Sequence, residues 1–474
     1  MEINQLEPKK VFYWFEQINN IPRGSGNEKG VSDFLVKFAE ERNLEVSQDE
    51  ALNVLIKKPA SKGYENSPIV ALQGHMDMVA VADEGVNHDF LKDPIEMEVR
   101  DGMLYAKGTS LGADDGMGVA YALAILDDEN ALHGPLEVLI TTEEETSMGG
   151  AMNFDTSKLS AKYLINIDSE EEGEFTVGCA GGIEVLSKFK KEYEKSSAED
   201  FIQIKLKGAT GGHSGMMIDR FRANAVKLLG RLLLELDDFR IAEISGGEKK
   251  NVISQKAYAL LQVKDKENAK KILKEKAKEI LKEFESTDPN LEILIEDGDK
   301  KDKVFTKELS YNLAKFIYLV FDGLFKKDLE LNTITTSANL GVLVETEDEI
   351  HVTDFVRSGL ESEKQDWAKK ISILSKTFGA EIELVNDFPV WEKQINELVE
   401  TAQKVWKDLY NKDSIVTTTH GGLETGFFAK TLKNTTMVSI GPTLFDVHSP
   451  KEHADIKSCE RVFEFTKKLL ESLK

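Results

Sequence analysis

The stretch Gln73-Gly74-His75-Met76-Asp77-Met78 stands where an apolar run, Ile69–Leu72, stops. The run predicts a buried β-strand with His75 at its carboxyl end. His75 and Asp77 are two residues apart, so an extended backbone points both side chains to the same side. An imidazole beside a carboxylate is a common pairing of a metal ligand with the group that orients it. An isolated pair of this kind is more often a loop histidine beside a solvated aspartate.

Acidic residues recur where other predicted strands end. Strand 136–141 leads into Glu143-Glu144-Glu145, and strand 163–167 leads into Asp168-Ser169-Glu170. A glycine-punctuated loop, Gly112-Ala113-Asp114-Asp115-Gly116, joins a short strand to a helix. Because open α/β sheets bind their ligands at the carboxyl ends of the strands, these side chains are expected to meet at one edge.

Three segments of the chain differ in character. Alternating strand and helix patterns over residues 1–185 and again over 383–474 predict two parts of one α/β catalytic domain with a mostly parallel sheet. Residues 186–382, with a last strand that continues to residue 385, contain two units of the same order, strand, helix and strand, within 257–295 and 350–385. We expect this segment to be an inserted α+β lid domain built from two related halves.

Composition excludes several classes of function. The 474 residues contain 84 Asp and Glu against 60 Lys and Arg, a net charge of -24 that argues against a nucleic-acid partner. Only Cys179 and Cys459 occur, too few for a disulfide framework. The first residues show no secretory signal pattern, and no stretch approaches the roughly 18 apolar residues of a membrane span. We therefore expect a cytoplasmic protein without a membrane partner.

Collected together, the strand-end groups form a recognisable ligand set. Two imidazoles with several carboxylates suit a pair of divalent metal ions, zinc first, with manganese or cobalt as alternatives. Taken singly, the acidic run could be a surface turn, and the paired aspartates could cap a helix. The residues of the set are His75, Asp77, Asp114, Asp115, Glu144, Glu145, Asp168 and His448.

The residues above belong to five motifs. In sequence and in their order along the chain, these motifs resemble those of the dinuclear zinc amidohydrolase and metallopeptidase family that includes carnosinases, aminoacylases and carboxypeptidase G. The similarity spans both ends of the chain and the insert, where it includes the motif Gly212-His213-Ser214-Gly215. Within the family, the chain is most similar to the dipeptidase branch. The five motifs are Gly74-His75-Met76-Asp77, Gly112-Ala113-Asp114-Asp115-Gly116, Glu143-Glu144-Glu145-Thr146, Ile167-Asp168-Ser169-Glu170 and His448-Ser449-Pro450.

The resemblance implies a role for each residue of the centre. His75 and Asp168 would hold one metal ion, Glu145 and His448 would hold the other, and Asp114 would bridge the two.

The resemblance also assigns the proton transfer. Glu144 would be the general base that takes a proton from a metal-bridging water and returns it to the leaving amine. Asp77 would orient the ring of His75. The peptide bond Asp114-Asp115 would be cis.

The inserted domain would bind substrate. The resemblance assigns oxyanion stabilisation to His213 and the substrate carboxylate to Arg357. From the residues alone, His213 could be a plain loop residue, and Arg357 could be an exposed strand arginine. Further substrate-side candidates are Asn332, Asn339, His420 and Glu424.

The function implied is metal-dependent hydrolysis of dipeptides with free termini, Xaa-His dipeptides among them. One alternative is an N-acyl amino acid deacylase on the same metal centre. Another is a binding protein that keeps the fold without the chemistry. Relatives often dimerise through the lid, so a homodimer is one expected assembly.

Overall fold

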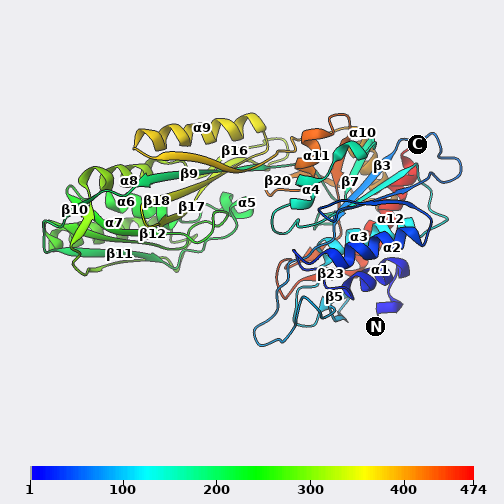
Figure 1. Ribbon diagram of the computed structural model, residues 1–474, viewed down its shortest axis with the longest axis horizontal. Helices are drawn as coiled ribbons and strands as arrows, with labels where there is room; N and C mark the ends of the chain where they lie inside the picture. The colour runs from blue at the N-terminus through cyan, green and yellow to red at the C-terminus, as the bar shows by residue number, and fades with distance from the viewer. Residues whose placement is uncertain (1–2) are drawn as a thin grey trace. The chain divides into compact units, whose positions relative to one another are not determined.

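The computed structural model describes residues 3–474, which form two compact units (Figure 1). Of the described residues, unit 1 comprises 3–178, Trp391–Thr418 and Leu423–Lys474, and unit 2 comprises Cys179–Val390 and Thr419–Gly422. The chain therefore leaves unit 1, builds unit 2 as an insertion, and returns to complete unit 1.

Unit 1 is built on a mixed sheet with a parallel centre. The central pairs β6–β3, β3–β7 and β7–β21 are parallel, whereas the flanking pairs β1–β2, β2–β6 and β21–β8 are antiparallel. The parallel strands are buried along their whole length or nearly so, as apolar strands are when helices cover both faces. In spatial order the eight strands are β1 (Glu45–Gln48), β2 (Val54–Lys58), β6 (Leu136–Thr141), β3 (Val70–His75), β7 (Tyr163–Asn166), β21 (Thr436–Ser439), β8 (Glu174–Cys179) and β20 (Ile415–Thr419).

Helix α3 (Ala113–Leu126) is buried on all sides after its first turn, because its residues from Gly116 onward are small or apolar around the whole circumference. It contacts α1 (Lys9–Asn19) and α12 (Ile456–Ser472). None of the helices over residues 3–474 is long and apolar enough to cross a membrane. The remaining helical segments of unit 1 are α2 (Lys29–Glu40), α4 (Gly149–Asn153), α10 (Glu397–Tyr410), α11 (Thr425–Thr431), η1 (Ile3–Gln5) and η2 (Thr156–Lys158).

A small antiparallel sheet carries the loop around His448. Its strands, in order, are β22 (Leu444–Phe445), β23 (His453–Asp455), β5 (Met103–Ala106) and β4 (Met97–Arg100). The ring of His453 stacks between those of Tyr105 and Phe445, with centroids 4.6 and 4.8 Å away. The stack fixes both ends of the loop between β22 and β23.

Unit 2 repeats one pattern twice, strand, helix, two strands, helix and strand. The first half contains β11 (Phe201–Lys207), α6 (Ala225–Leu233), β12 (Phe239–Gly246), β13 (Ala257–Val263), α7 (Lys266–Glu283) and β14 (Glu292–Asp297). The second contains β9 (Gly181–Lys190), α8 (Lys307–Leu319), β17 (Ile334–Glu345), β18 (Glu349–Ser358), α9 (Glu361–Thr377) and β19 (Glu381–Phe388).

The two halves share one sheet in the order β14-β11-β13-β12-β17-β18-β9-β19, so that the second strands of both halves meet at its centre. Each half has the same internal strand order, which confirms the predicted pair of related halves. The other elements of unit 2 are β10 (Tyr193–Lys195), β15 (Lys303–Phe305), β16 (Gly323–Lys327), α5 (Ser214–Met217) and η3 (Ile218–Arg220).

Alternation along β17 and β18 separates an apolar face from a polar one. Val352 and Val356 belong to the large apolar core of the unit, which includes residues of α6, α7, α8 and α9. Arg357 and Ser337 have the opposite parity on these paired strands and point away from that core. The polar face therefore presents two of the candidate substrate-binding residues, Arg357 and Asn339.

Candidate metal centre

Three neighbouring strands of unit 1 bring four of the predicted residues to one edge. His75 is the last residue of β3, Glu144 and Glu145 follow β6, and Asp168 follows β7. Because β6, β3 and β7 run parallel in that spatial order, their carboxyl ends lie side by side.

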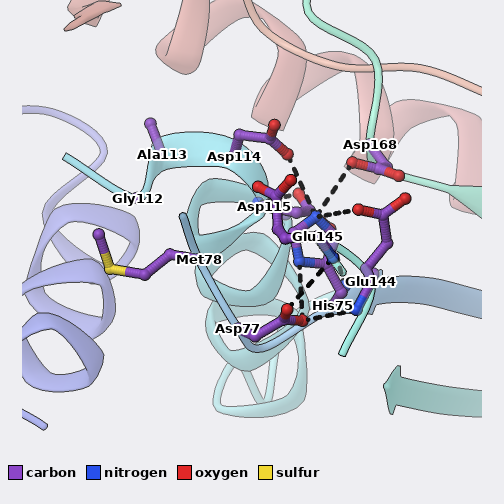
Figure 2. Close-up of polar contacts among 12 residues, drawn as sticks. His75, Asp77, Met78, Gly112, Ala113, Asp114, Asp115, Glu144, Glu145 and Asp168 are labelled. Carbon is purple, nitrogen blue, oxygen red and sulfur yellow. Dashed lines mark hydrogen bonds and ion pairs between the residues drawn. The ribbon is translucent and has the colours of Figure 1, made fainter. Parts of the chain in front are cut away.

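The ring of His75 is buried, 1% exposed, and its Nε2 faces three carboxylates. Nε2 lies 3.2 Å from Oδ1 of Asp114, 3.4 Å from Oδ1 of Asp168 and 4.0 Å from Oε2 of Glu144. Figure 2 shows these three side chains on one side of the ring and Asp77 on the other. One nitrogen is thus directed at a cluster of oxygen donors.

His448 approaches the same cluster from the loop between β22 and β23. Its Nε2 lies 2.9 Å from Oε2 of Glu145 and 3.1 Å from Oδ2 of Asp114. These two hydrogen bonds raise the pKa of His448 to about 11. Half of the His448 side chain, 51%, is exposed, so this side of the cluster is open to solvent.

Three sets of ligand atoms lie within 4.8 Å of one another, namely His75 with Asp114 and Asp168, Asp114 with Glu145 and His448, and His75 with Glu144 and Glu145. The first two sets share Asp114, whose two oxygens face different imidazoles. Zinc and similar divalent ions are coordinated by imidazole nitrogens and carboxylate oxygens. The donor set therefore fits two divalent ions with one shared carboxylate.

Charge crowding in the cluster shifts several pKa values. Burial opposes the charged form of His75, but hydrogen bonds with Asp114 and Asp168 outweigh it and raise the pKa well above its usual value. Burial raises the pKa of Asp168 to about 6. Burial, Asp168 and Glu145 raise the pKa of Glu144 well above its usual range. Divalent cations between such carboxylates would relieve their repulsion, which supports the fit.

Asp77 is buried beneath the ring of His75. Its Oδ1 lies 3.4 Å from Nδ1 of His75 and accepts a hydrogen bond of 3.1 Å from the backbone N–H of Glu144. Its Oδ2 accepts hydrogen bonds from Ser25 Oγ at 2.8 Å and from the backbone N–H of Glu145 at 3.3 Å. The structure therefore places Asp77 where it can orient the ring and the loop after β6 together.

The loop before α3 approaches β3 closely. The peptide bond between Asp114 and Asp115 is cis, as the resemblance predicts. Oδ2 of Asp115 accepts the backbone N–H of His75 at 3.2 Å, and a Cβ on Gly74 would lie 2.1 Å from that oxygen. Position 74 consequently has room only for glycine.

Two buried residues that the motifs did not single out contact this loop. Arg23 donates a hydrogen bond to the carbonyl oxygen of Gly112, and Glu452 accepts backbone N–H groups of residues 111–114. The sequence contains only weak indications that these two residues contact the loop. Arg23 lies in a short proline and glycine-rich turn, and Glu452 follows His448 by four residues.

Unit 2 gathers other predicted residues on the polar face of its sheet. Arg357 is 7% exposed, so the alternative of an exposed strand arginine is wrong. Its Nη2 lies 3.4 Å from Nε2 of His213, and its Nη1 lies 3.5 Å from the carbonyl oxygen of His420. His420 Nε2 lies 2.7 Å from Ser337 Oγ, and burial, aided by Arg357 and His213, lowers the pKa of His420 to about 3. His420 is therefore neutral at physiological pH.

The two asparagine candidates differ in position. Asn339 is buried, and its Nδ2 donates hydrogen bonds to the carbonyl oxygens of Lys250 at 2.9 Å and Val252 at 3.0 Å. It thereby secures the segment that pairs with His213 in an isolated bridge. Asn332 lies in an exposed loop between β16 and β17.

Glu424 belongs to unit 1, where it is fully buried. Its Oε2 accepts hydrogen bonds from Thr141 Oγ1 at 2.5 Å and Gln73 Nε2 at 2.6 Å. Burial raises its pKa to about 8. The structure places Glu424 against the side chains of β3 and β6, near the end that carries His75.

An imidazole and carboxylate cluster at the carboxyl edge of an α/β sheet is typical of metal-dependent hydrolases. The model of peptidase family M20/M25/M40 matches residues 71–472, and the chain belongs to this family. The match covers every residue of the cluster, all of unit 2 and unit 1 from residue 71 to residue 472, and it confirms the family expected from the five motifs.

Relatives match the chain over its whole length. It is 36% identical to the cytosol non-specific dipeptidase of Escherichia coli K12 over 480 aligned residues, which cover 100% of this chain and 99% of that relative. The crystal structure of aminoacylhistidine dipeptidase from Vibrio alginolyticus matches with a TM-score of 0.90 and 32% identity, covering 100% and 98% of the two chains. Aminopeptidase PepT from Bacillus cereus, at a TM-score of 0.59 and 15% identity over 99% of each chain, shows the shared fold alone.

Proposed function

We propose that this protein is a dipeptidase that uses two divalent metal ions to hydrolyse dipeptides with free termini, Xaa-His dipeptides among them. The observation that carries the proposal is Asp114, whose two oxygens lie 3.2 and 3.1 Å from the Nε2 atoms of His75 and His448. The dipeptidase names of the Escherichia coli and Vibrio relatives, which match the whole chain, support the substrate class.

We assign His75 and Asp168 to one ion, Glu145 and His448 to the other, and Asp114 to both. Zinc suits this mixture of nitrogen and oxygen donors, and manganese or cobalt accepts the same set. Bound divalent ions would polarise the scissile carbonyl and let water act as a nucleophile at neutral pH.

We assign proton transfer to Glu144. Its Oε2 lies 4.0 Å from Nε2 of His75, and its side chain is 13% exposed, so the carboxylate borders the centre and stays within reach of solvent. Glu144 takes the proton of the attacking water and passes it to the leaving amine. The hydrogen bond from its backbone N–H to Asp77 holds the backbone that carries this carboxylate.

We assign recognition of the substrate's free carboxylate to Arg357, with His213 beside it. The Nε of Arg357 and the Nδ1 of His420 have no hydrogen-bond partner among the residues that the structure describes, although both atoms are buried. A guanidinium group with an unused donor suits a carboxylate, which accepts charge-assisted hydrogen bonds. In this proposal His213 stabilises the oxyanion, and the neutral His420 adds a further polar contact.

The name of the Escherichia coli relative places that protein in the cytosol, and we propose a cytosolic location here as well. The net charge of -24 speaks against a nucleic-acid partner. We also propose that the protein forms a homodimer. Light scattering tests this, because a dimer would have twice the mass of the monomer.

A substrate panel tests the proposed function. Metal-loaded protein is assayed with Leu-His, β-Ala-His and Gly-Gly, and with N-acetyl amino acids at matched concentrations. We expect the dipeptides to be hydrolysed with the higher kcat/KM. A preference for the acetylated compounds would instead indicate a deacylase.

A further inference from the structure

The carboxylate of Glu452 is enclosed by backbone amides of the loop that presents Asp114. It is 3% exposed, and Oε2 accepts the N–H groups of Leu111 and Gly112, both at 2.8 Å. Oε1 accepts those of Ala113 at 2.7 Å and Asp114 at 3.3 Å. Four donors thus satisfy a dehydrated carboxylate, which is the usual condition for a charge to be buried.

Arg23 holds the same loop through its carbonyl groups. Its Nη2 donates to the carbonyl oxygen of Gly112 at 2.5 Å, and its Nη1 donates to those of Met76 and Asp77 at 3.0 Å each. The guanidinium therefore ties the loop before α3 to the segment that follows His75.

Gly112 has no room for a side chain between these contacts. A Cβ at this position would lie 2.5 Å from Nη2 of Arg23 and 2.8 Å from Sδ of Met78. Figure 2 shows Met78 and Gly112 on the same side of the site. The residue also adopts a φ of 67°, a conformation that favours glycine. Backbone, guanidinium and carboxylate therefore fix the path of the loop immediately before Asp114.

We propose that Glu452 is a positioning residue that sets the distance between Asp114 and His448. It reaches the backbone of Asp114 directly, and it follows His448 by four residues in the segment between β22 and β23. One buried carboxylate thereby joins two segments that carry assigned metal ligands. The inference rests on the proposed function for the reaction that this geometry serves.

The effect of substitution follows from the donors that surround the carboxylate. In Glu452→Gln, one carboxylate oxygen becomes an NH2 group that faces two backbone N–H groups. Because an NH2 group cannot accept their hydrogen bonds, both of these contacts are lost. Removing a group that orients a metal ligand typically weakens metal affinity about 10–100-fold, and we expect a loss of this size. We also expect kcat to fall with KM changed less than about twofold, because substrate binding is not touched. Glu452→Asp keeps the charge on a shorter side chain. Its metal affinity and kcat should lie between those of wild type and Glu452→Gln.

The test is calorimetric titration of metal-free protein with Zn2+, together with the visible spectrum of the Co2+ form. Wild type, both Glu452 variants and the control Glu471→Gln are compared, since Glu471 is partly exposed and pairs with Lys468 on α12. Thermal unfolding of the metal-free proteins separates folding from metal binding. Weaker affinity in a folded Glu452→Gln protein, with an altered Co2+ spectrum, supports the proposal.

Wild-type metal affinity in Glu452→Gln would overturn the proposal, as would an effect confined to thermal unfolding. If the Gln variant does not fold, the Asp variant decides by the same criterion, and unchanged affinity counts against positioning. Failure of the proposed function is distinguishable, because it would appear as a wild-type protein that binds two ions yet leaves every dipeptide intact.

Discussion

The backbone N–H of Glu144 donates a hydrogen bond of 3.1 Å to Oδ1 of Asp77. The same oxygen lies 3.4 Å from Nδ1 of His75. Asp77 thus contacts both an assigned metal ligand and the segment of the assigned base. The sequence predicted only the first of these contacts, so the carboxylate has a wider role in the geometry than expected.

Asp77→Asn should weaken zinc binding about 10–100-fold, the usual effect of losing a group that orients a ligand. The new NH2 group would face backbone N–H groups that now donate to the carboxylate, so the loop after β6 should shift as well. Competition with a chromophoric chelator measures the affinity. The control is Asp413→Asn, whose side chain is 89% exposed and pairs with Lys407. An Asp77→Asn protein with wild-type zinc affinity would contradict the assigned role.

Glu144→Gln should lower kcat about 10²–10⁴-fold, the typical contribution of a general base, because the amide cannot accept the proton of the attacking water. Metal analysis of the purified variant should still find two ions per chain. Glu143→Gln is the neighbouring control, since Glu143 is exposed and accepts a hydrogen bond from Ser147. Full hydrolytic activity in Glu144→Gln would refute the mechanism.

Positions such as His75, Glu145 and Asp168 could be predicted because each lies at the end of an apolar strand or in the loop that follows it. Parallel neighbours then bring strand ends together, and the structure shows these side chains in one cluster. Such positions can be predicted because the apolar pattern of a buried strand is contained in a short stretch of sequence.

Arg23 and Glu452 could not be predicted in this way. They contact backbone groups of Gly112 from 89 and 340 positions away, and backbone groups look alike at every residue. The pairing of β12 with β17, which joins the two halves of unit 2, likewise depends on contacts distant in sequence. Tertiary contacts of this kind leave no periodic pattern in the chain.

Arg357→Met should lower kcat/KM for dipeptides about 10–100-fold, the equivalent of one charge-assisted hydrogen bond of roughly 1.5–3 kcal/mol. The loss should be much smaller for dipeptide amides, which lack the free carboxylate. Comparing acid and amide forms of one dipeptide in both proteins gives a double-mutant cycle. Equal losses on the two substrates would show that Arg357 does not bind the carboxylate.

Asp354 of β18 lies in the buried interior of unit 2, and neither of its oxygens has a hydrogen-bond partner among the described residues. Burial raises its pKa well above the usual value; Lys227 opposes the shift, and Asp322 adds to it. The unfolded chain ionises this group near pH 3.9, about where a free aspartate does, whereas the folded protein keeps the proton. Stability should therefore fall as pH rises above that value toward the folded pKa, because the unfolded state then binds fewer protons.

Asp354→Asn should remove this part of the pH dependence and gain stability relative to wild type as the pH rises. Urea unfolding at about pH 5 and about pH 8, on either side of neutrality, measures the difference in slope. Asp348→Asn, at an exposed position just before the same strand, is the matched control. Parallel pH profiles for wild type and Asp354→Asn would show that the folded protein ionises Asp354 normally.

In the proposed mechanism, Asp114 joins two metal ions into one catalytic centre. The most direct measurement is a zinc titration of metal-free protein in which bound metal and Leu-His hydrolysis are followed together. We expect no hydrolysis without metal, and a maximal rate only when two ions are bound per chain. Full activity in the metal-free protein, or a maximal rate with one ion bound, would contradict the two-metal centre.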